Sequence, residues 1–273
     1  CILIYTKEQL IALRDRVNGG DTCEGKTIKL MNDIDLNGSD SDQWIPMKEF
    51  AGTFDGDYHS IKNLYMKSEQ YKVLSMFENL TETAEVKNLR IENCYIENNY
   101  QQVIYNEGLG KYVCENYASA VCNYNYGTIS NVEVSGNIKG YIPTLENIPT
   151  NTRLVRAHVS GICGGGNYGY IQSCVNQTNI EGESLTETKE GMDEFMGAYV
   201  SGICNGNVGV IVNCYNTGNL KANGYNTVLV GGICATSGEN TVSQEVNCYH
   251  IGQIETNIVT ARIRSGGIVG KTV

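Results

Sequence analysis

Apolar and polar positions repeat along this chain in one recurring pattern. The segment Ser119–Gly140 shows the same pattern as Ser160–Gly182 and Ser201–Ala222. A looser copy covers Gly231–Glu255, and the opening of another copy, GGIVG, lies at Gly266–Gly270. Self-similarity of this kind is the sequence signature of proteins built from stacked repeats. We therefore expect one repetitive architecture that continues beyond the last residue of the chain.

Two positions of the repeat carry apolar residues or cysteine in every copy. The first position is occupied by Phe77, Cys122, Cys163, Cys204, Cys234 and Val269. The second position is occupied by Leu89, Val132, Cys174, Cys214 and Cys248. Because cysteine alternates there with Phe, Val and Leu, it behaves as a small buried hydrophobe. We predict that each set forms a column in the core.

Each copy contains three short β-like stretches separated by turn residues. The turn motif N-x-G-x-I recurs at Asn125–Ile129, Asn167–Ile171 and Asn207–Ile211, where glycine suits a tight corner with positive φ. Such units bury their apolar face only when they stack on one another. The pattern predicts an all-β fold, a right-handed parallel β-helix (β-solenoid) with a short N-terminal capping helix.

Asparagine often precedes the second column position. The residues concerned are Asn88, Asn131, Asn213 and Asn247, with Ser173 in the remaining copy. Stacked amides satisfy one another's donors and acceptors in successive coils. We expect a ladder of asparagines, with separate exposed turn residues as the alternative.

The spacing between copies exceeds one compact coil, and the excess falls before each G-[IV]-C motif. The inserted segments are Glu97–Ala118, Tyr141–Ala157, Glu183–Tyr199, Asn223–Thr227 and Thr256–Arg264. Insertions at one phase of a repeat emerge on one side, which is often the binding face. One of them is a candidate binding segment because it carries the acidic residues Glu183, Glu187, Glu190, Asp193 and Glu194. A solvated acidic loop has the same composition.

The N-terminal segment has a helical pattern. Thr6-x-x-Gln9 matches a capping box, Leu10, Leu13 and Val17 form a stripe, and glycines follow Asn18. We predict a helix over Ile2–Asn18 that covers the open end of the first coil. Residues 1–22 then form the capping helix and entry strand, and residues 23–273 form a single solenoid of degenerate repeats.

Composition and charge exclude several classes of protein. A formal charge of −10 argues against nucleic acid as the partner, because phosphate contacts need clustered Lys and Arg. No run of eighteen apolar residues occurs, so we expect no membrane span. The repeat cysteines stand about ten residues apart without histidine companions, which disfavours zinc and every other cofactor. Disulfides remain an alternative to a mostly reduced column.

Two acidic clusters are candidates for chemistry. Asp33, Asp35 and Asn37 copy the opening of a calcium-binding loop, although Trp44 replaces the glutamate at its twelfth position. Asp55 and Asp57 are close enough in sequence for polysaccharide chemistry, although their motif forms a tight turn. We find no column of Lys or Arg bases, and no H-E-x-x-H motif. We therefore assign no catalytic residue.

Several motifs resemble the GLUG repeats of bacterial surface proteins. The matching segments are WIPM at Trp44–Met47, FAGTFDGDYHSIKNL at Phe50–Leu64, SGIC at Ser201–Cys204 and NCYNTG at Asn213–Gly218. The departure from that family is cysteine at the third position of the G-[LI]-x-G motif. The resemblance implies a non-catalytic repeat region of secreted or wall-attached proteins, found in adhesin-like arrays and upstream of immunoglobulin-A-cleaving zinc peptidases.

These observations lead to a functional expectation. We expect an extracellular or surface-attached bacterial module for adhesion, binding or spacing, with a glycan or a surface protein as its partner. The alternative is a β-helix polysaccharide lyase or glycoside hydrolase.

Overall fold

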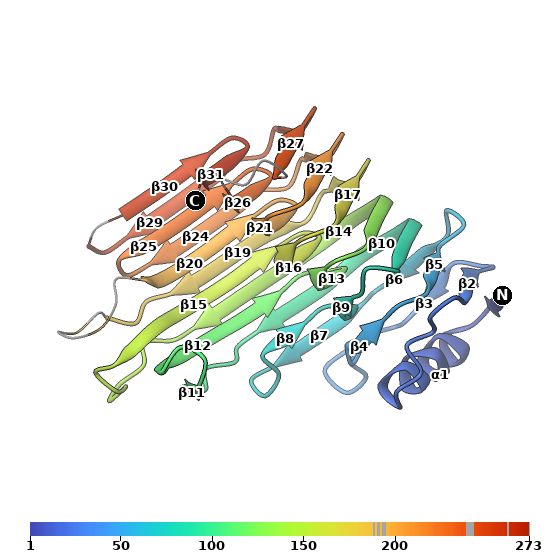
Figure 1. Cartoon of the computed structure of the whole chain (residues 1–273), viewed down its shortest axis with the longest axis horizontal. Helices are drawn as coiled ribbons and strands as arrows, with labels where there is room; N and C mark the ends of the chain where they lie inside the picture. Colours follow the sequence, from blue (N-terminus) through green and yellow to red (C-terminus); the bar gives the residue numbers. More distant parts are fainter. Residues whose placement is uncertain (188, 190–191, 193–194, 239–242, 261, 273) are drawn as a thin grey trace.

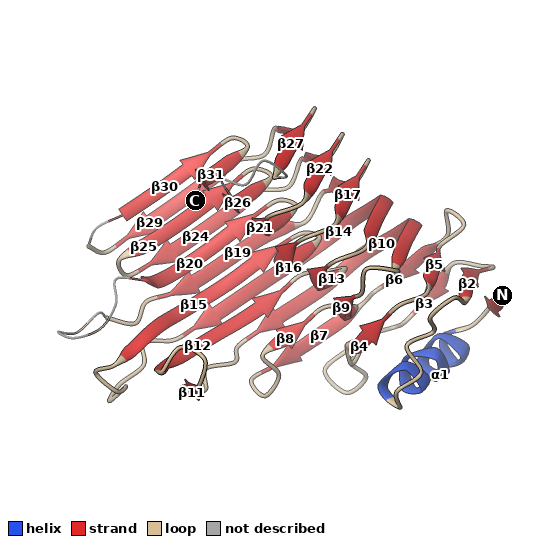
Figure 2. Cartoon of the chain, viewed as in Figure 1, coloured by secondary structure: helices blue, strands red, loops and turns tan. Residues whose placement is uncertain are grey.

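The computed structural model describes residues 1–187, 189, 192, 195–238, 243–260 and 262–272. In this part of the chain nearly every element is a strand, and α1 (Lys7–Asn18) is the one helix (Figure 2). The strands form three sheets, which we number 1 to 3. None of the described helical residues form a segment long and apolar enough to cross a membrane. The part of the chain that the structure describes is therefore all-β apart from α1.

Sheet 1 is the largest of the three. Its strands are β1 (Ile2–Ile4), β2 (Thr27–Leu30), β3 (Ile34–Asp35), β5 (Thr53–Asp55), β6 (Ser60–Lys62), β7 (Tyr65–Ser68), β10 (Glu85–Asn98), β14 (Thr128–Ile142), β17 (Tyr170–Gln172), β18 (Val175–Asn176), β19 (Asn179–Ser184), β22 (Val210–Val212), β23 (Tyr215–Asn216), β24 (Leu220–Gly224), β27 (Gln244–Val246), β28 (Tyr249–His250) and β29 (Ile254–Ile258).

Sheets 2 and 3 contain seven strands each. Sheet 2 consists of β8 (Val73–Leu74), β11 (Ile104–Asn106), β12 (Lys111–Ala118), β15 (Thr152–Ser160), β20 (Phe195–Ser201), β25 (Thr227–Gly231) and β30 (Arg262–Gly266). Sheet 3 consists of β4 (Met47–Phe50), β9 (Phe77–Leu80), β13 (Cys122–Asn125), β16 (Cys163–Asn167), β21 (Cys204–Asn207), β26 (Cys234–Ser237) and β31 (Val269–Thr272).

The chain passes through the sheets in the same order again and again. From β13 in sheet 3 it enters sheet 1 at β14, continues to β15 in sheet 2, and returns to sheet 3 at β16. We call each such circuit a coil. Every strand pairs in parallel with its equivalent in the next coil, while β11 runs antiparallel to β12. Figure 1 shows the coils stacked side by side from the N-terminal to the C-terminal end.

The core runs continuously through the stack and changes in composition along it. In the first coils the rings of Phe50, Phe54 and Phe77 pack together with centroids 5.1 to 6.5 Å apart. In later coils the same interior contains small side chains such as Cys163 and Ala198, both fully buried. Along β19 and β24 buried residues alternate with more exposed ones, which is the period of two expected of a strand.

Corners between the sheets depend on glycine and asparagine. The corner glycine Gly169 lies so close to the preceding coil that a Cβ atom there would come within 2.1 Å of the Gly127 carbonyl oxygen. Next to it, the buried Asn167 donates through Nδ2 to Asn207 Oδ1 at 2.8 Å and accepts from Asn125 Nδ2 at 2.7 Å. This motif was predicted to form tight turns with positive φ at its glycines. The φ angles of Gly127, Gly169 and Gly209 are not positive, so that part of the prediction was wrong, and glycine is needed there because the neighbouring coil approaches closely. The asparagines of the motif bond from coil to coil.

The N-terminal segment differs from the prediction at its start. Ile2–Ile4 is not helical but forms β1, which pairs with β2, and the helix begins at Lys7. The predicted cap is present, because Thr6 Oγ1 accepts from Gln9 N at 3.4 Å. Gln9 Oε1 accepts from Tyr5 N rather than from the cap residue itself. The helix lies at the N-terminal end of the stack beside β4, and Asn18 bonds to Lys48 N (Figure 1).

The predicted insertions are only partly loops. Lys111–Ala118, Thr152–Ser160 and Phe195–Ser201 form strands of sheet 2, although the sequence pattern assigned most of these residues to insertions. The three-stretch repeat therefore missed one strand in each coil. The reason is that the pattern was aligned on the cysteine positions, and sheet 2 contributes no repeat cysteine.

Candidate functional site

The first predicted column lies in sheet 3 with equivalent residues paired from coil to coil. Phe77 is in register with Cys122, which is in register with Cys163. The series continues through Cys204 and Cys234 to Val269. Phe77 and the four cysteines are fully buried, and Val269, in the last coil, is partly buried.

The second predicted column lies at a corner of sheet 1. Leu89 and Val132 are register partners, and the Cys174 backbone N–H lies 3.4 Å from Cys214 Sγ in the next coil. Cys248 in the last coil is less buried than these four residues. The column therefore runs beside the first one through the interior.

All eleven cysteines are free thiols. Burial raises the pKa of the Cys163, Cys204 and Cys234 thiols well above the usual range. Thiolate is the form that binds metals and attacks electrophiles, so these side chains are inert packing groups at neutral pH. The described residues contain no group of three or more His, Cys, Asp or Glu side chains arranged around a common point.

The structure describes two of the five acidic residues in the candidate binding segment. Glu183 lies in β19 and accepts a hydrogen bond from Asn223 Nδ2 at 2.8 Å, while the exposed Glu187 accepts from the Tyr225 hydroxyl at 3.1 Å. Glu190, Asp193 and Glu194 lie outside the described residues. The two described carboxylates thus contact the following coil, and Glu183 belongs to a strand rather than to a loop.

The calcium candidates are exposed and already bonded within the protein. Asp33 forms an ion pair with Lys62 at 2.8 Å, which lowers the pKa of that carboxyl to about 2. Asp35 accepts from Asn63 Nδ2 and from the Asn37 backbone N–H, both at 2.8 Å. These contacts hold the first two coils together, and a calcium ion would compete with them for the same oxygen atoms.

A continuous row of aromatic rings crosses the outer side of sheets 2 and 3, which we call the aromatic track. Its members, in spatial order, are Tyr126, Tyr168, Tyr124, Tyr117, His158 and Tyr199. Tyr126 and Tyr168 stack with centroids 4.8 Å apart, and so do Tyr117 and His158 at 4.6 Å. The track combines residues of three successive coils, because strand register places Tyr117, His158 and Tyr199 beside one another.

The track is open at one end and buried at the other. Tyr126 and Tyr168 are 44% and 49% exposed, whereas Tyr117 and His158 are each 8% exposed. Ring faces that remain accessible next to a rigid, partly buried set of rings form a platform for a flat apolar ligand surface. The track therefore has one accessible and one enclosed section.

Charged groups surround the enclosed section. Glu115 Oε1 lies 3.3 Å from His158 Nε2, and Lys72 Nζ lies 3.6 Å from Glu115 Oε2. The Lys72 ammonium and the Arg156 guanidinium also lie over the rings of Tyr117 and Tyr199, at 5.4 and 4.7 Å from the centroids, as in cation–π contacts.

Burial determines the protonation of this pair. Burial is the largest influence on the pKa of His158 and lowers it, so the imidazole is neutral at pH 7. Burial also opposes ionisation of Glu115, but the hydrogen bond from His158 and the nearby positive charges outweigh it and lower the pKa of the carboxyl. A neutral imidazole beside a carboxylate must carry its proton on Nε2, because the carboxylate only accepts.

Sequence reasoning missed this site for an identifiable reason. Glu115 and Tyr199 fall within segments assigned to insertions, and His158 directly follows one of these segments. The alternation in LVRAHVS, Leu154–Ser160, was the available signal, since inward Val155, Ala157 and Val159 flank the outward arginine and histidine.

A column of alternating lysines and glutamates is present on sheet 1. Register places Lys67, Glu97, Lys139, Glu181, Lys221 and Glu255 one above another. Glu181 lies between Lys139 at 3.8 Å and Lys221 at 3.2 Å. The column differs from the column of Lys or Arg bases considered for lyase chemistry, because a glutamate stands between each lysine and the next.

Comparisons with known proteins give little further information. No family model matches the sequence, and no curated protein matches it. A solved structure described as a putative immunoglobulin A1 protease from Bacteroides ovatus has 17% identity and a TM-score of 0.46. That match covers 99% of this chain and 83% of the other chain.

Proposed function

We propose that this chain is a right-handed β-solenoid module of a secreted or surface-attached bacterial protein, and that it binds glycans through the aromatic track. The repeated passage through three parallel sheets supports the solenoid assignment, because parallel crossover connections are overwhelmingly right-handed. The GLUG-like motifs support the extracellular location and the bacterial source. The observation that carries the binding function is the track itself.

The accessible rings suit a sugar. Pyranose rings present flat faces of C–H groups that pack on aromatic side chains, and Tyr126 and Tyr168 present stacked rings that are nearly half exposed. Tyrosine adds a hydroxyl group that bonds to sugar hydroxyls at the edge of the contact. The net charge of −10 disfavours polyanionic ligands, so we expect a neutral glycan.

The enclosed section supports binding rather than hydrolysis. A glycoside hydrolase of the usual kind needs two carboxyl groups on opposite sides of the scissile bond, one of which has a raised pKa. Among the described residues of the track and its charged border, Glu115 is the one carboxylate, and its pKa is lowered. A carboxylate that stays ionised is a hydrogen-bond acceptor for sugar hydroxyls and a poor general acid.

Affinity electrophoresis in gels containing single polysaccharides tests the proposal. We expect at least one neutral polysaccharide to retard the protein, and the double variant Tyr126→Ala/Tyr168→Ala to lose that retardation. Both rings are largely solvent-exposed, so their removal should leave folding intact. Tyr5→Ala, which removes a tyrosine that is 45% exposed at the other end of the stack, is the matched control and should be retarded like the parent.

Two results would contradict the proposal. Equal retardation of the parent and the double variant would show that binding does not depend on the aromatic track. Release of reducing or unsaturated sugar ends during incubation with the retarding polysaccharide would favour the enzyme instead.

A further inference from the structure

One corner of sheet 1 carries a ladder of left-handed residues. Asn88, Asn131, Ser173, Asn213 and Asn247 occupy equivalent positions, each directly after a strand segment in register with its neighbours, and their φ angles lie between 49° and 54°. Asparagine tolerates this backbone region better than most residues. The predicted ladder is confirmed for two pairs. Asn131 Nδ2 donates to Asn88 Oδ1 and Asn247 Nδ2 donates to Asn213 Oδ1, both at 3.2 Å.

The ladder has a gap at Ser173. In both bonded pairs the amide of the later coil donates to the amide oxygen of the earlier coil, so residue 173 should accept from Asn213 and donate to Asn131. The serine side chain is too short to bridge either distance, because neighbouring parallel strands are about 4.8 Å apart. Consequently Asn131 Oδ1 accepts no hydrogen bond within the described protein, and Asn213 Nδ2 donates none. Both side chains are exposed.

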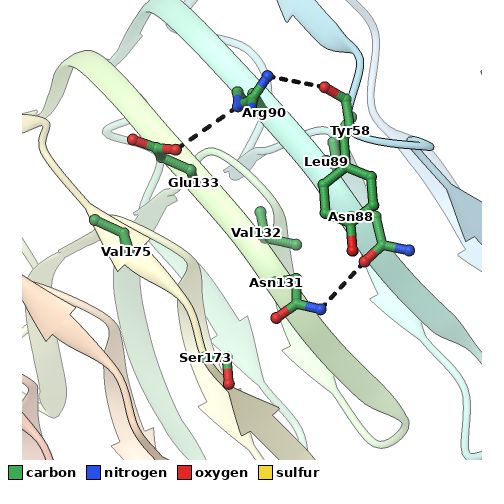
Figure 3. A pocket seen from close by; sticks show the side chains of 9 residues that line it. All are labelled: Tyr58, Asn88, Leu89, Arg90, Asn131, Val132, Glu133, Ser173 and Val175. Atoms are coloured by element: carbon green, nitrogen blue, oxygen red, sulfur yellow. Dashed lines mark hydrogen bonds and ion pairs between the residues drawn. The ribbon is translucent and has the colours of Figure 1, made fainter.

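A depression of about 260 Å³ lies at this gap. Four successive coils line it, and Figure 3 shows Asn88, Asn131 and Ser173 following one another along one side. On the other side Arg90 donates to the Tyr58 carbonyl oxygen at 2.9 Å and faces Glu133 at 3.8 Å (Figure 3). Val175, which is partly exposed, completes the lining with an apolar side chain, whereas the side chains of Leu89 and Val132 are buried in the core behind it. The depression thus combines an unused amide acceptor, charged groups and an apolar contact.

We propose that this depression binds a ligand that carries an acetamido group, such as an N-acetylated hexosamine, and that the ligand amide occupies the place of the missing asparagine side chain. The ligand N–H donates to Asn131 Oδ1. Its carbonyl oxygen accepts from Asn213 Nδ2, which belongs to the next coil, beyond the residues that line the depression. Its methyl group contacts Val175. The ring hydroxyls then face Arg90 and Glu133, whose partly exposed charged groups bond to hydroxyls in either direction.

This site goes beyond the proposed glycan platform, because it shares no residue with the aromatic track and lies on another sheet. The acetamido group is favoured over a glutamine or asparagine side chain of a protein partner, since only the acetamido group places a methyl group beside the valine. The surface is shallow and wet, so we expect a dissociation constant in the millimolar range.

Saturation-transfer difference NMR with N-acetylglucosamine tests the site, with glucose and glucosamine as matched ligands. We expect transfer to the acetyl methyl group of N-acetylglucosamine and at least fivefold weaker binding of the other two sugars. The variant Ser173→Asn should complete the ladder. We expect it to abolish the acetyl signal and to keep or raise the melting temperature. Ser41→Asn, at an exposed serine outside the ladder, should bind like the parent protein.

A second variant keeps the test independent of Ser173→Asn. In Asn213→Asp the side chain still accepts from Asn247 but has no N–H group for the ligand carbonyl, so binding should weaken at least fivefold. Undiminished binding by either folded variant, or equal binding of glucose, would overturn the proposal. Stronger binding of N-acetylglutamine amide than of the sugar would overturn the assignment to a sugar. The Tyr126→Ala/Tyr168→Ala variant should retain the acetyl signal, which separates this site from the aromatic track.

Discussion

At the scale of single residues, one partly buried pair, His158 and Glu115, is held in a single protonation state. Their side chains are 10% and 12% exposed, and Nε2 lies 3.3 Å from Oε1. The folded protein holds the imidazole neutral and the carboxyl ionised, since the pKa of each group is lowered. Stability should therefore depend on pH in a predictable direction.

Acidification should destabilise the protein through His158. Above its unfolded pKa of about 6.5 the histidine is neutral in the folded and in the unfolded protein, so its titration does not change the free energy of unfolding. As pH falls below that value the unfolded chain binds a proton that the folded protein does not, so the free energy of unfolding falls. Glu115 adds a further loss as pH falls below about 4.3, the usual glutamate pKa. We expect the melting temperature to drop between pH 7.5 and pH 5.5.

The variant His158→Gln isolates this effect. Glutamine donates to Glu115 but does not titrate, so the drop in melting temperature over the same pH range should be smaller than in the parent. His59→Gln, which removes a surface imidazole in the first coils, is the control and should keep the parent's drop. Identical pH profiles for His158→Gln and the parent would show that the buried imidazole does not limit stability.

At the scale of strands, outward columns define which residues face each other across coils. The alternating Lys–Glu column on sheet 1 places opposite charges on every pair of neighbouring strands that it crosses. Like charges opposite each other in a sheet are destabilising, and opposite charges are favourable. The alternation therefore favours the observed pairing over slipped pairings that would bring lysines together.

Reversing one charge tests the contribution of this column. Glu181→Lys places three lysines in succession with Lys139 and Lys221, so we expect a lower melting temperature than in the parent at low ionic strength. The difference should shrink in 0.5 M NaCl, where the screening length is about 4 Å. Glu181→Gln removes the charge without the repulsion and should lie between the two proteins. A difference that does not change with salt would attribute the loss to packing instead.

The difference between inward and outward positions explains which parts of the fold the sequence predicted. Inward positions accept few residue types, so Cys163, Cys204 and Cys234 identified the repeat and the stacking even though coils differ in length. Outward positions accept almost any polar residue, and the column members stand between 30 and 42 residues apart. Without the register, these lysines and glutamates look like scattered surface charges. The rings of Tyr117, His158 and Tyr199 were missed on the same grounds, because they come from strands of sheet 2 with no repeat cysteine. Tyr124, Tyr126 and Tyr168 lie within or directly after strands that carry one.

At the scale of the whole molecule, each coil contacts mainly its neighbours, so stability is expected to vary along the stack. The N-terminal end is covered by α1, whose Leu10, Leu13 and Val17 are buried in the common core. The last described coil has less cover, since Ile251 is 71% exposed and Val259 62% exposed. The same inward position should therefore contribute differently in different coils.

One inward column allows that comparison directly. Ile138, Ile180, Leu220 and Ile254 are register partners, but Ile180 is 1% exposed, whereas Ile254 is only partly buried. Ile180→Ala should lower the free energy of unfolding by about 3 kcal/mol, because it leaves a cavity between two covering coils. Ile254→Ala should lower it by less than about 1 kcal/mol, because water already reaches that site. Urea unfolding followed by tyrosine fluorescence measures both values, and equal losses would mean that the final coil is as tightly packed as the middle of the stack.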